Sequence, residues 1–116
     1  MDQTDAFRVL ASADRQLVLH ELVDDSDPIA VGSLATRVAA RRHKISSGAV
    51  SDEQADRAQV RLVHLHFPQL ESRDIIAIDW ETREVQLGDS TDVTAVLEAA
   101  EELEQWPPDD MLASLS

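Results

Sequence analysis

Residues 61–80 read RLVHLHFPQLESRDIIAIDW and change character halfway along. The first half has the apolar spacing of a helix, and this helix continues through a proline at Pro68. A proline inside a helix lacks one backbone donor and presses on the carbonyl four residues earlier, so we expect a bend there. The second half is an apolar run of strand type from Ile75 to Asp79. The segment therefore predicts a long helix that leads directly into a β-hairpin.

Helix and strand patterns also cover the rest of the chain. We expect a first helix capped by Thr4, further helices at 14–23, at 34–42 behind Ser33, at 52–73 and at 92–105, a short strand at 29–31, and strands at 75–79 and 84–87 joined by a turn. The apolar face of the long helix should consist of Ala55, Ala58, Leu62, Val63, Leu65, Phe67 and Leu70.

This order of elements predicts an α+β fold that is mostly α. Its outline is that of a winged helix-turn-helix domain, with a two-stranded hairpin as the wing and an extra C-terminal helix. Residues 1–105 would form the domain and residues 106–116 a frayed acidic tail.

The charge balance is unusual for a chain of 116 residues. There are 23 acidic residues and 10 basic ones, of which only Lys44 is a lysine. Such a surface is typical of proteins from a salt-rich cytoplasm, where a Debye length of about 3 Å weakens the repulsion of nucleic acid. The alternative is an acidic protein of ordinary salt, whose field repels nucleic acid.

Several classes of function find no support in the sequence. The chain has no cysteine, which excludes disulfides and cysteine-ligated zinc, and it has no apolar run long enough for a membrane span. His64 and His66 are two residues apart and point to different helix faces, so we expect no metal. Without a nucleophile signature or a glycine-rich phosphate loop, we expect no enzyme and no cofactor. Because no apolar run could span a membrane, we expect a soluble cytoplasmic protein.

Three segments together resemble one known family. Residues 66–76, HFPQLESRDII, resemble the end of the recognition helix in ArsR-type winged-helix repressors, where histidine, two spaced leucines, glycine and an apolar pair follow one another. Residues 7–19 resemble the family's opening helices, and residues 31–35 resemble the entry to its third helix. With the acidic composition, the chain is most similar to small winged-helix proteins of haloarchaea. The resemblance implies a transcription regulator that binds duplex DNA.

The chain departs from that family in three places. Asp74 stands where the family has glycine, at a position that needs a left-handed backbone. Pro68 lies inside the helix, and residues 43–51 make a longer connection than the 3–4 residues of a tight helix-turn-helix. The long helix also opens with Asp52, Glu53 and Asp56, whose carboxylates would repel phosphates.

Two groups of basic residues are candidates for DNA contact. Arg57, Arg61 and His64 have the spacing of one exposed helical stripe, and arginine reads guanine well. The second group lies in residues 28–51, which contain no acid and include Arg41, Arg42 and Lys44. Arg83 would contact DNA from the hairpin. The alternatives are pairing of Arg57 and Arg61 with Glu53 and Asp56, and helix capping by the second group.

The first and last helices carry apolar stripes that would suit a homodimer. The predicted interface consists of Phe7, Leu10, Val93, Val96, Leu97, Ala100 and Leu103. The alternative is packing of the two helices within one chain.

Two further classes of function stay open beside a dimeric DNA-binding regulator: a winged-helix protein-interaction module without DNA binding, and an adaptor subunit of transcription or replication machinery.

Overall fold

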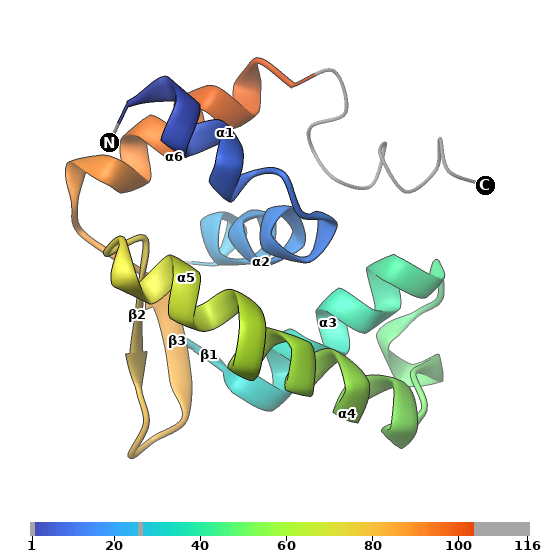
Figure 1. Cartoon of the computed structure of the whole chain (residues 1–116). Coiled ribbons are helices and arrows are strands. Elements are labelled where there is room, and N and C mark those ends of the chain that lie inside the picture. The colour runs from blue at the N-terminus through green and yellow to red at the C-terminus, as the bar shows by residue number, and fades with distance from the viewer. Residues whose placement is uncertain (1, 26, 104–116) are drawn as a thin grey trace.

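The computed structural model describes residues 2–25 and 27–103 (Figure 1). Its fold is α+β and mostly helical, with one small antiparallel sheet. The helices are α1 (Gln3–Val9), α2 (Ala13–Asp24), α3 (Val31–His43), α4 (Asp52–Arg61), α5 (Phe67–Ser72) and α6 (Thr91–Glu101), with a short 3-10 turn, η1 (Ser47–Ala49), and a π turn, η2 (Leu62–His66). The strands are β1 (Ile29–Ala30), β2 (Ile76–Asp79) and β3 (Glu84–Leu87).

The sheet joins the predicted hairpin to the short strand near residue 29. Its order is β1-β3-β2, and the central Val85 faces Ile29 on one side and Ile78 on the other. Val85 is fully buried, so the middle of the sheet belongs to the core. Helices α2 and α3 and the π turn η2 add Leu17, Leu34 and Leu62 to that core, among other buried residues.

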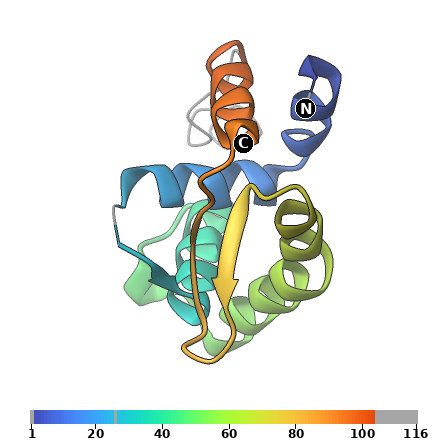
Figure 2. The ribbon, with the colours of Figure 1, turned by 90° about the vertical axis from the view of Figure 1, so that its left-hand side faces the viewer.

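The first and last helices lie side by side above α2 (Figures 1 and 2). Leu10, Val96 and Ala100 are buried between these helices and the rest of the chain, and Val93 is nearly so. The expectation that both apolar stripes remain free for a second copy was therefore wrong for these four residues. Phe7, Leu97 and Leu103 are half-buried.

Several helix boundaries differ from the predicted ones. Helix α1 begins at Gln3, since the Asp2 carboxylate accepts the amide proton of Asp5 at 2.8 Å, in place of a Thr4 cap. Helix α3 begins at Val31 and not behind Ser33. Helix α6 ends at Glu101; the predicted end near residue 105 and the tail at 106–116 lie outside the described residues.

The proline in the long helix is accommodated by a wider turn. The amide of Phe67 donates to the carbonyl of Leu62, five residues back, and all residues from Asp52 to Ser72 are helical. Pro68 then falls in the first turn of α5, where a missing backbone donor costs little. Where the sequence predicted a bend, the helix has a π turn, a feature that often marks functional sites.

The extra residue in the π turn shifts the buried face of the helix by one position. A regular α-helix would bury Leu65 together with Ala58 and Leu62, as predicted. Leu65 is instead 51% exposed, and His66 is buried at 5% exposure beside Phe67. The interior of the protein therefore receives an ionisable side chain where an apolar one was expected.

The helix ends where the sequence predicted a left-handed residue. Asp74 has φ 58°, and the amide of Ile75 donates back to the carbonyl of Leu70 at 3.0 Å. This geometry satisfies carbonyls at the end of the helix and turns the chain into β2.

Candidate functional site

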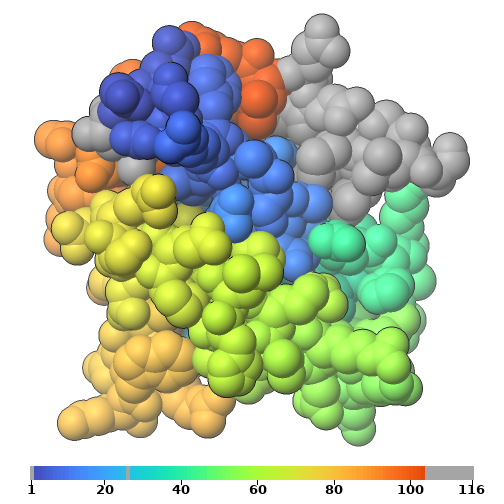
Figure 3. Space-filling view, in the orientation of Figure 1, coloured from blue at the N-terminus to red at the C-terminus, as the bar shows by residue number. Residues whose placement is uncertain are grey.

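A groove runs between the long helix and the β2–β3 hairpin. It has a volume of about 440 Å³ and is lined by Asp56, Gln59, Val60, Val63, His64 and Arg83. The hairpin projects from the molecule beside the helix (Figures 1 and 3). Val60, at 57% exposure, and Val63 give the groove an apolar part among polar side chains. We call this site the hairpin groove.

Arg83 holds an unusual backbone conformation at the end of the hairpin turn. Its φ of 57° lies in the left-handed region, where glycine or asparagine is preferred and other residues are strained. Its side chain makes no ion pair with any residue of the described ranges, 2–25 and 27–103. The turn therefore presents an exposed guanidinium at the edge of the hairpin groove.

The predicted stripe of Arg57, Arg61 and His64 is divided between two environments. Arg57 and His64 are exposed, and Arg57 pairs with Glu53 one turn earlier, as the alternative interpretation expected. Arg61 instead turns towards α2, where its Nε donates to Oδ2 of Asp14 at 2.9 Å. The exposed face of the helix consequently carries Asp56, Arg57, Val60 and His64.

Asp14 is the centre of a buried ion cluster that joins four elements. It lies in the first turn of α2 and is only 3% exposed. Besides Arg61 of α4, it accepts a hydrogen bond from Nη1 of Arg42 in α3 at 2.9 Å, and Nε2 of His66 lies 3.3 Å from its Oδ2. Burial raises the pKa of Asp14, but the hydrogen bond and charge of Arg61, with the charge of Arg42, outweigh it and lower the pKa overall.

His66 takes a defined tautomer in this cluster. Arginine only donates, so Nδ1 of His66 must accept from Nη1 of Arg15, 3.2 Å away. The ring proton then lies on Nε2 and points to Asp14. Burial lowers the pKa of His66, and the charge of Arg15 lowers it further against the opposing effect of Asp14. The neutral ring is the form that fits both neighbours.

The arginines of the acid-free segment, residues 28–51, form ion pairs with acids from outside that segment. Arg41 donates to Glu21 of α2, and Arg37 lies 3.7 Å from Glu21 and 3.5 Å from Asp25. Lys44 takes a left-handed conformation with φ 56° at the end of α3. Arg37, Arg41 and Arg42 thus pair with acids of α2 and stabilise the fold. Lys44 lies at the C-terminal end of α3.

A second hollow lies where the end of α3 meets the start of α4. It has a volume of about 460 Å³ and is lined by Arg42, His43, Ser51, Glu53, Gln54, Arg57 and Arg61. Ser51 and Gln54 exchange side-chain and backbone hydrogen bonds that cap α4. Of the predicted DNA contacts, this hollow, which we call the arginine pocket, brings together Arg42, Arg57 and Arg61, while His64 and Arg83 meet in the hairpin groove.

Comparison with known proteins identifies the family. The family model described as "Domain of unknown function (DUF7344)" matches residues 7–86, which is more than half of the chain. The chain belongs to the DUF7344 family. No curated protein and no solved structure matches it. The DUF7344 match contains both the hairpin groove and the arginine pocket, and it ends within β3, before α6.

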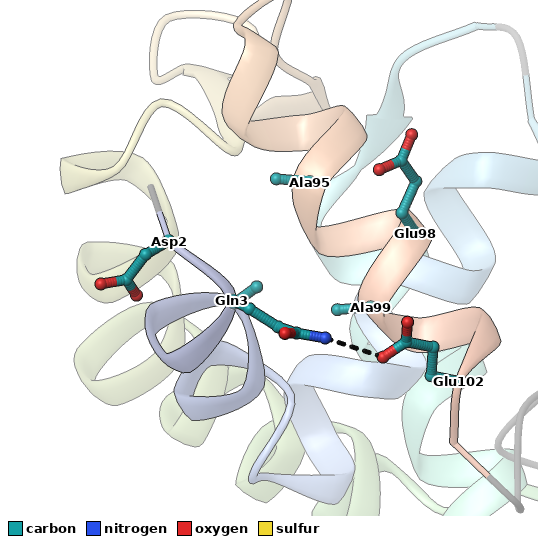
Figure 4. Close-up of a pocket in the computed structure, with 7 residues that line it drawn as sticks. Asp2, Gln3, Ala95, Glu98, Ala99 and Glu102 are labelled. Atoms are coloured by element: carbon teal, nitrogen blue, oxygen red, sulfur yellow. Dashed lines mark hydrogen bonds between the residues drawn. The ribbon is translucent and has the colours of Figure 1, made fainter.

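A third hollow, between α1 and α6, is lined entirely by residues outside the DUF7344 match (Figure 4). It has a volume of about 250 Å³ and is lined by Asp2, Gln3, Ala6, Ala95, Glu98, Ala99 and Glu102. Nε2 of Gln3 donates to the carboxylate of Glu102 at 2.9 Å, which ties the two helices together. This hollow thus has carboxylates around small apolar residues, and none of the residues of the predicted dimer interface lines it.

Two further classes of site bear on the chemistry of the molecule, metal sites and membrane spans. Within residues 2–25 and 27–103, no three histidine or carboxylate side chains are grouped so that they could hold a metal ion. No helix in that part of the chain is both long and apolar enough to cross a lipid bilayer.

Proposed function

We propose that this chain is a winged-helix domain that binds duplex DNA as a transcription regulator. In this proposal the exposed face of α4 enters the major groove and the β2–β3 hairpin acts as the wing. The order of helices and strands and the sheet order β1-β3-β2 are consistent with this architecture. The protein would work at high salt, for which its net charge of -13 is suited.

The observation that carries the proposal is the hairpin groove. It joins the exposed side chains of the long helix to the guanidinium of Arg83, which has no ion-pair partner among the described residues. Gln59 and His64 offer hydrogen bonds to base edges, and Val60 offers an apolar contact for a thymine methyl group. Arg83 would contact the sugar-phosphate backbone or the adjacent minor groove.

The test is selection of binding sites from a random duplex library in concentrated and in dilute KCl. A selected duplex should then bind Arg83→Ala about tenfold or more weakly than the parent, because a charge-assisted contact is lost. Arg8→Ala is the matched control, since Arg8 is an exposed arginine of α1 that pairs only with Asp5 among the described residues. Failure to enrich any duplex at either salt concentration would overturn the proposal.

A protein-interaction module is the second candidate, and two observations favour it. Val60 and Leu65 on the long helix are both more than half exposed, which is unusual for large apolar side chains on a reading helix. Most of the arginines are also paired with acids of the same chain, which reduces the positive charge available to phosphates. Enrichment of no duplex in the selection would favour this candidate over the first.

We further propose that the regulator pairs as a homodimer through α1 and α6 in concentrated salt. Only Phe7, Leu97 and Leu103 of the predicted interface remain partly exposed, so they would form its apolar centre. Screening of the surrounding carboxylates would favour pairing. Light scattering of the parent and of Leu97→Glu in concentrated KCl tests this, with Val60→Glu as a control outside the interface. A parent that stays monomeric at high protein concentration contradicts it.

A further inference from the structure

The arginine pocket concentrates positive charge in a chain whose net charge is -13. Three guanidinium groups, those of Arg42, Arg57 and Arg61, line it together with a single carboxylate, that of Glu53. They come from two helices and approach one another where the end of α3 meets the start of α4. Like charges that share a hollow repel one another, so their convergence needs a compensating anion.

Asp14 compensates two of these cations only from the inside. It accepts from Nη1 of Arg42 and from Nε of Arg61, one nitrogen of each guanidinium. Each arginine carries five N–H donors, and both side chains are 40% exposed. Asp14 therefore fixes the position of both groups and leaves further donors of each available on the side of the pocket.

Arg57 is compensated by a pair that an incoming anion can replace. Its partner Glu53 is 71% exposed and Arg57 is 72% exposed. An exposed pair of this kind contributes little to stability, and its two side chains exchange partners readily. The third guanidinium is thus available, at small cost, to a ligand in the pocket.

We propose that the arginine pocket binds a phosphoryl anion. The planar guanidinium fork matches two phosphate oxygens at once, and three forks around one hollow can neutralise a dianion. The helix dipole at the start of α4 beside the pocket favours an anion, and the carboxylates of Asp52 and Glu53 in the same turn oppose it, so the three guanidinium groups carry the proposal. The source of the phosphoryl group is either the DNA backbone or a free phosphorylated compound, for which a volume of about 460 Å³ is sufficient. The site is separate from the hairpin groove and does not depend on DNA binding there.

The first experiment titrates the full chain with inorganic phosphate at constant ionic strength, followed by amide and arginine side-chain NMR. We expect a saturable shift of the signals of Ser51, Gln54 and Arg57. Arg57→Gln should weaken phosphate binding about tenfold or more, because one charge-assisted contact is lost. Glu53→Gln should strengthen it, since the competing carboxylate is removed. Arg8→Gln removes an arginine charge far from the pocket and should leave the binding constant unchanged.

These variants avoid Arg42 and Arg61, whose loss would leave Asp14 buried without a partner and destabilise the fold. Non-saturable shifts in the parent, or an equal binding constant in Arg57→Gln and the parent, would overturn the proposal. A generic stabilisation by phosphate as a salt would act on all variants alike and also counts against it.

A second experiment distinguishes the two sources once phosphate binding is seen. Competition between inorganic phosphate and a duplex for the parent, lost in Arg57→Gln, identifies a backbone phosphate as the occupant. Phosphate binding that leaves duplex affinity unchanged identifies a free phosphorylated compound. Either result supports a phosphoryl site. Arg83→Ala separates this proposal from DNA binding by the hairpin groove, because that variant should keep its phosphate affinity.

Discussion

Nε2 of His66 lies 3.3 Å from Oδ2 of Asp14, while Nδ1 of the same ring faces Arg15. The pair links the π turn of the long helix to the first turn of α2 across the interior of the protein. Arg15 also donates from Nε to the carbonyl of Val9 at 2.7 Å and from Nη2 to that of Arg8 at 3.1 Å, so α1 is attached to the same cluster. The long helix, which lines the hairpin groove, and α1, which packs beside α6, are therefore joined through one buried polar cluster.

Stability should fall in two steps as the pH is lowered. The pKa of His66 lies below its ordinary value of about 6.5, so the unfolded chain binds more protons than the folded one once the pH drops past that value. The pKa of Asp14 is also lowered, so a second loss follows at more acidic pH as that carboxylate is protonated. Urea unfolding across this pH range, at fixed salt concentration, measures both steps.

His66→Gln should remove the first step, because glutamine does not titrate. His64→Gln is the matched control, since His64 is exposed and contacts neither Asp14 nor Arg15. An unchanged first step in His66→Gln would mean that another group governs stability near neutral pH.

Asp14→Ala should be among the most destabilising substitutions in the chain. It would leave Arg42, Arg61 and His66 without their shared acceptor in a partly buried site, and breaking buried ion pairs of this kind costs about 3–5 kcal/mol. Glu53→Ala breaks an exposed pair and should cost less than about 1 kcal/mol. The free energy of unfolding from urea titration compares them, and similar values would contradict the central role of Asp14.

Gly88→Ala should destabilise the connection between β3 and α6. A Cβ at this position would lie 2.3 Å from the carbonyl oxygen of Asp74, which is backbone and cannot move aside easily. We expect a cost of roughly 1–3 kcal/mol, as for overpacking elsewhere in protein interiors. Gly48→Ala is the control, because a Cβ there meets nothing within 4 Å. Thermal unfolding of the two variants should differ clearly, with Gly48→Ala near the parent.

Arg83→Gly should change stability and DNA affinity in opposite directions. Glycine relieves the left-handed strain at this position, so the free energy of unfolding should rise by up to about 1 kcal/mol. The same change removes the exposed guanidinium of the hairpin groove, so affinity for a selected duplex should fall. Calorimetry and fluorescence anisotropy on one preparation test both effects. If the variant binds the selected duplex as tightly as the parent, Arg83 does not contact DNA.

The sequence predicted the parts of the fold that depend on neighbours along the chain. The hairpin strands, the long helix up to residue 72 and the left-handed Asp74 follow from local patterns and appear at or close to the expected positions. Leu65 was assigned to the wrong face because a π turn changes the helical period, and Pro68 was the only local signal of such an irregularity.

The candidate site was only partly predictable, because its charges are paired over long distances. Asp14 binds partners 28 and 47 residues further along the chain, and no local pattern reveals such pairs. The absence of acids from residues 28–51 indicated a basic surface, but Glu21 and Asp25 of another helix neutralise part of it. Val60 and Gln59 were not singled out, since neither carries a charge and the groove that they line forms only when the hairpin folds beside the helix.

The π turn also sets which faces α4 and α5 present to the rest of the molecule. A five-residue turn is equivalent to one inserted residue, so it offsets the rotational phase of α5 from that of α4 by a fixed angle. Deleting a single residue from the turn would restore a uniform helix and rotate α4 by about 100° relative to α5. Asp14 holds Arg61 ahead of the turn and His66 at its last position, so this rotation would move one of the two out of reach.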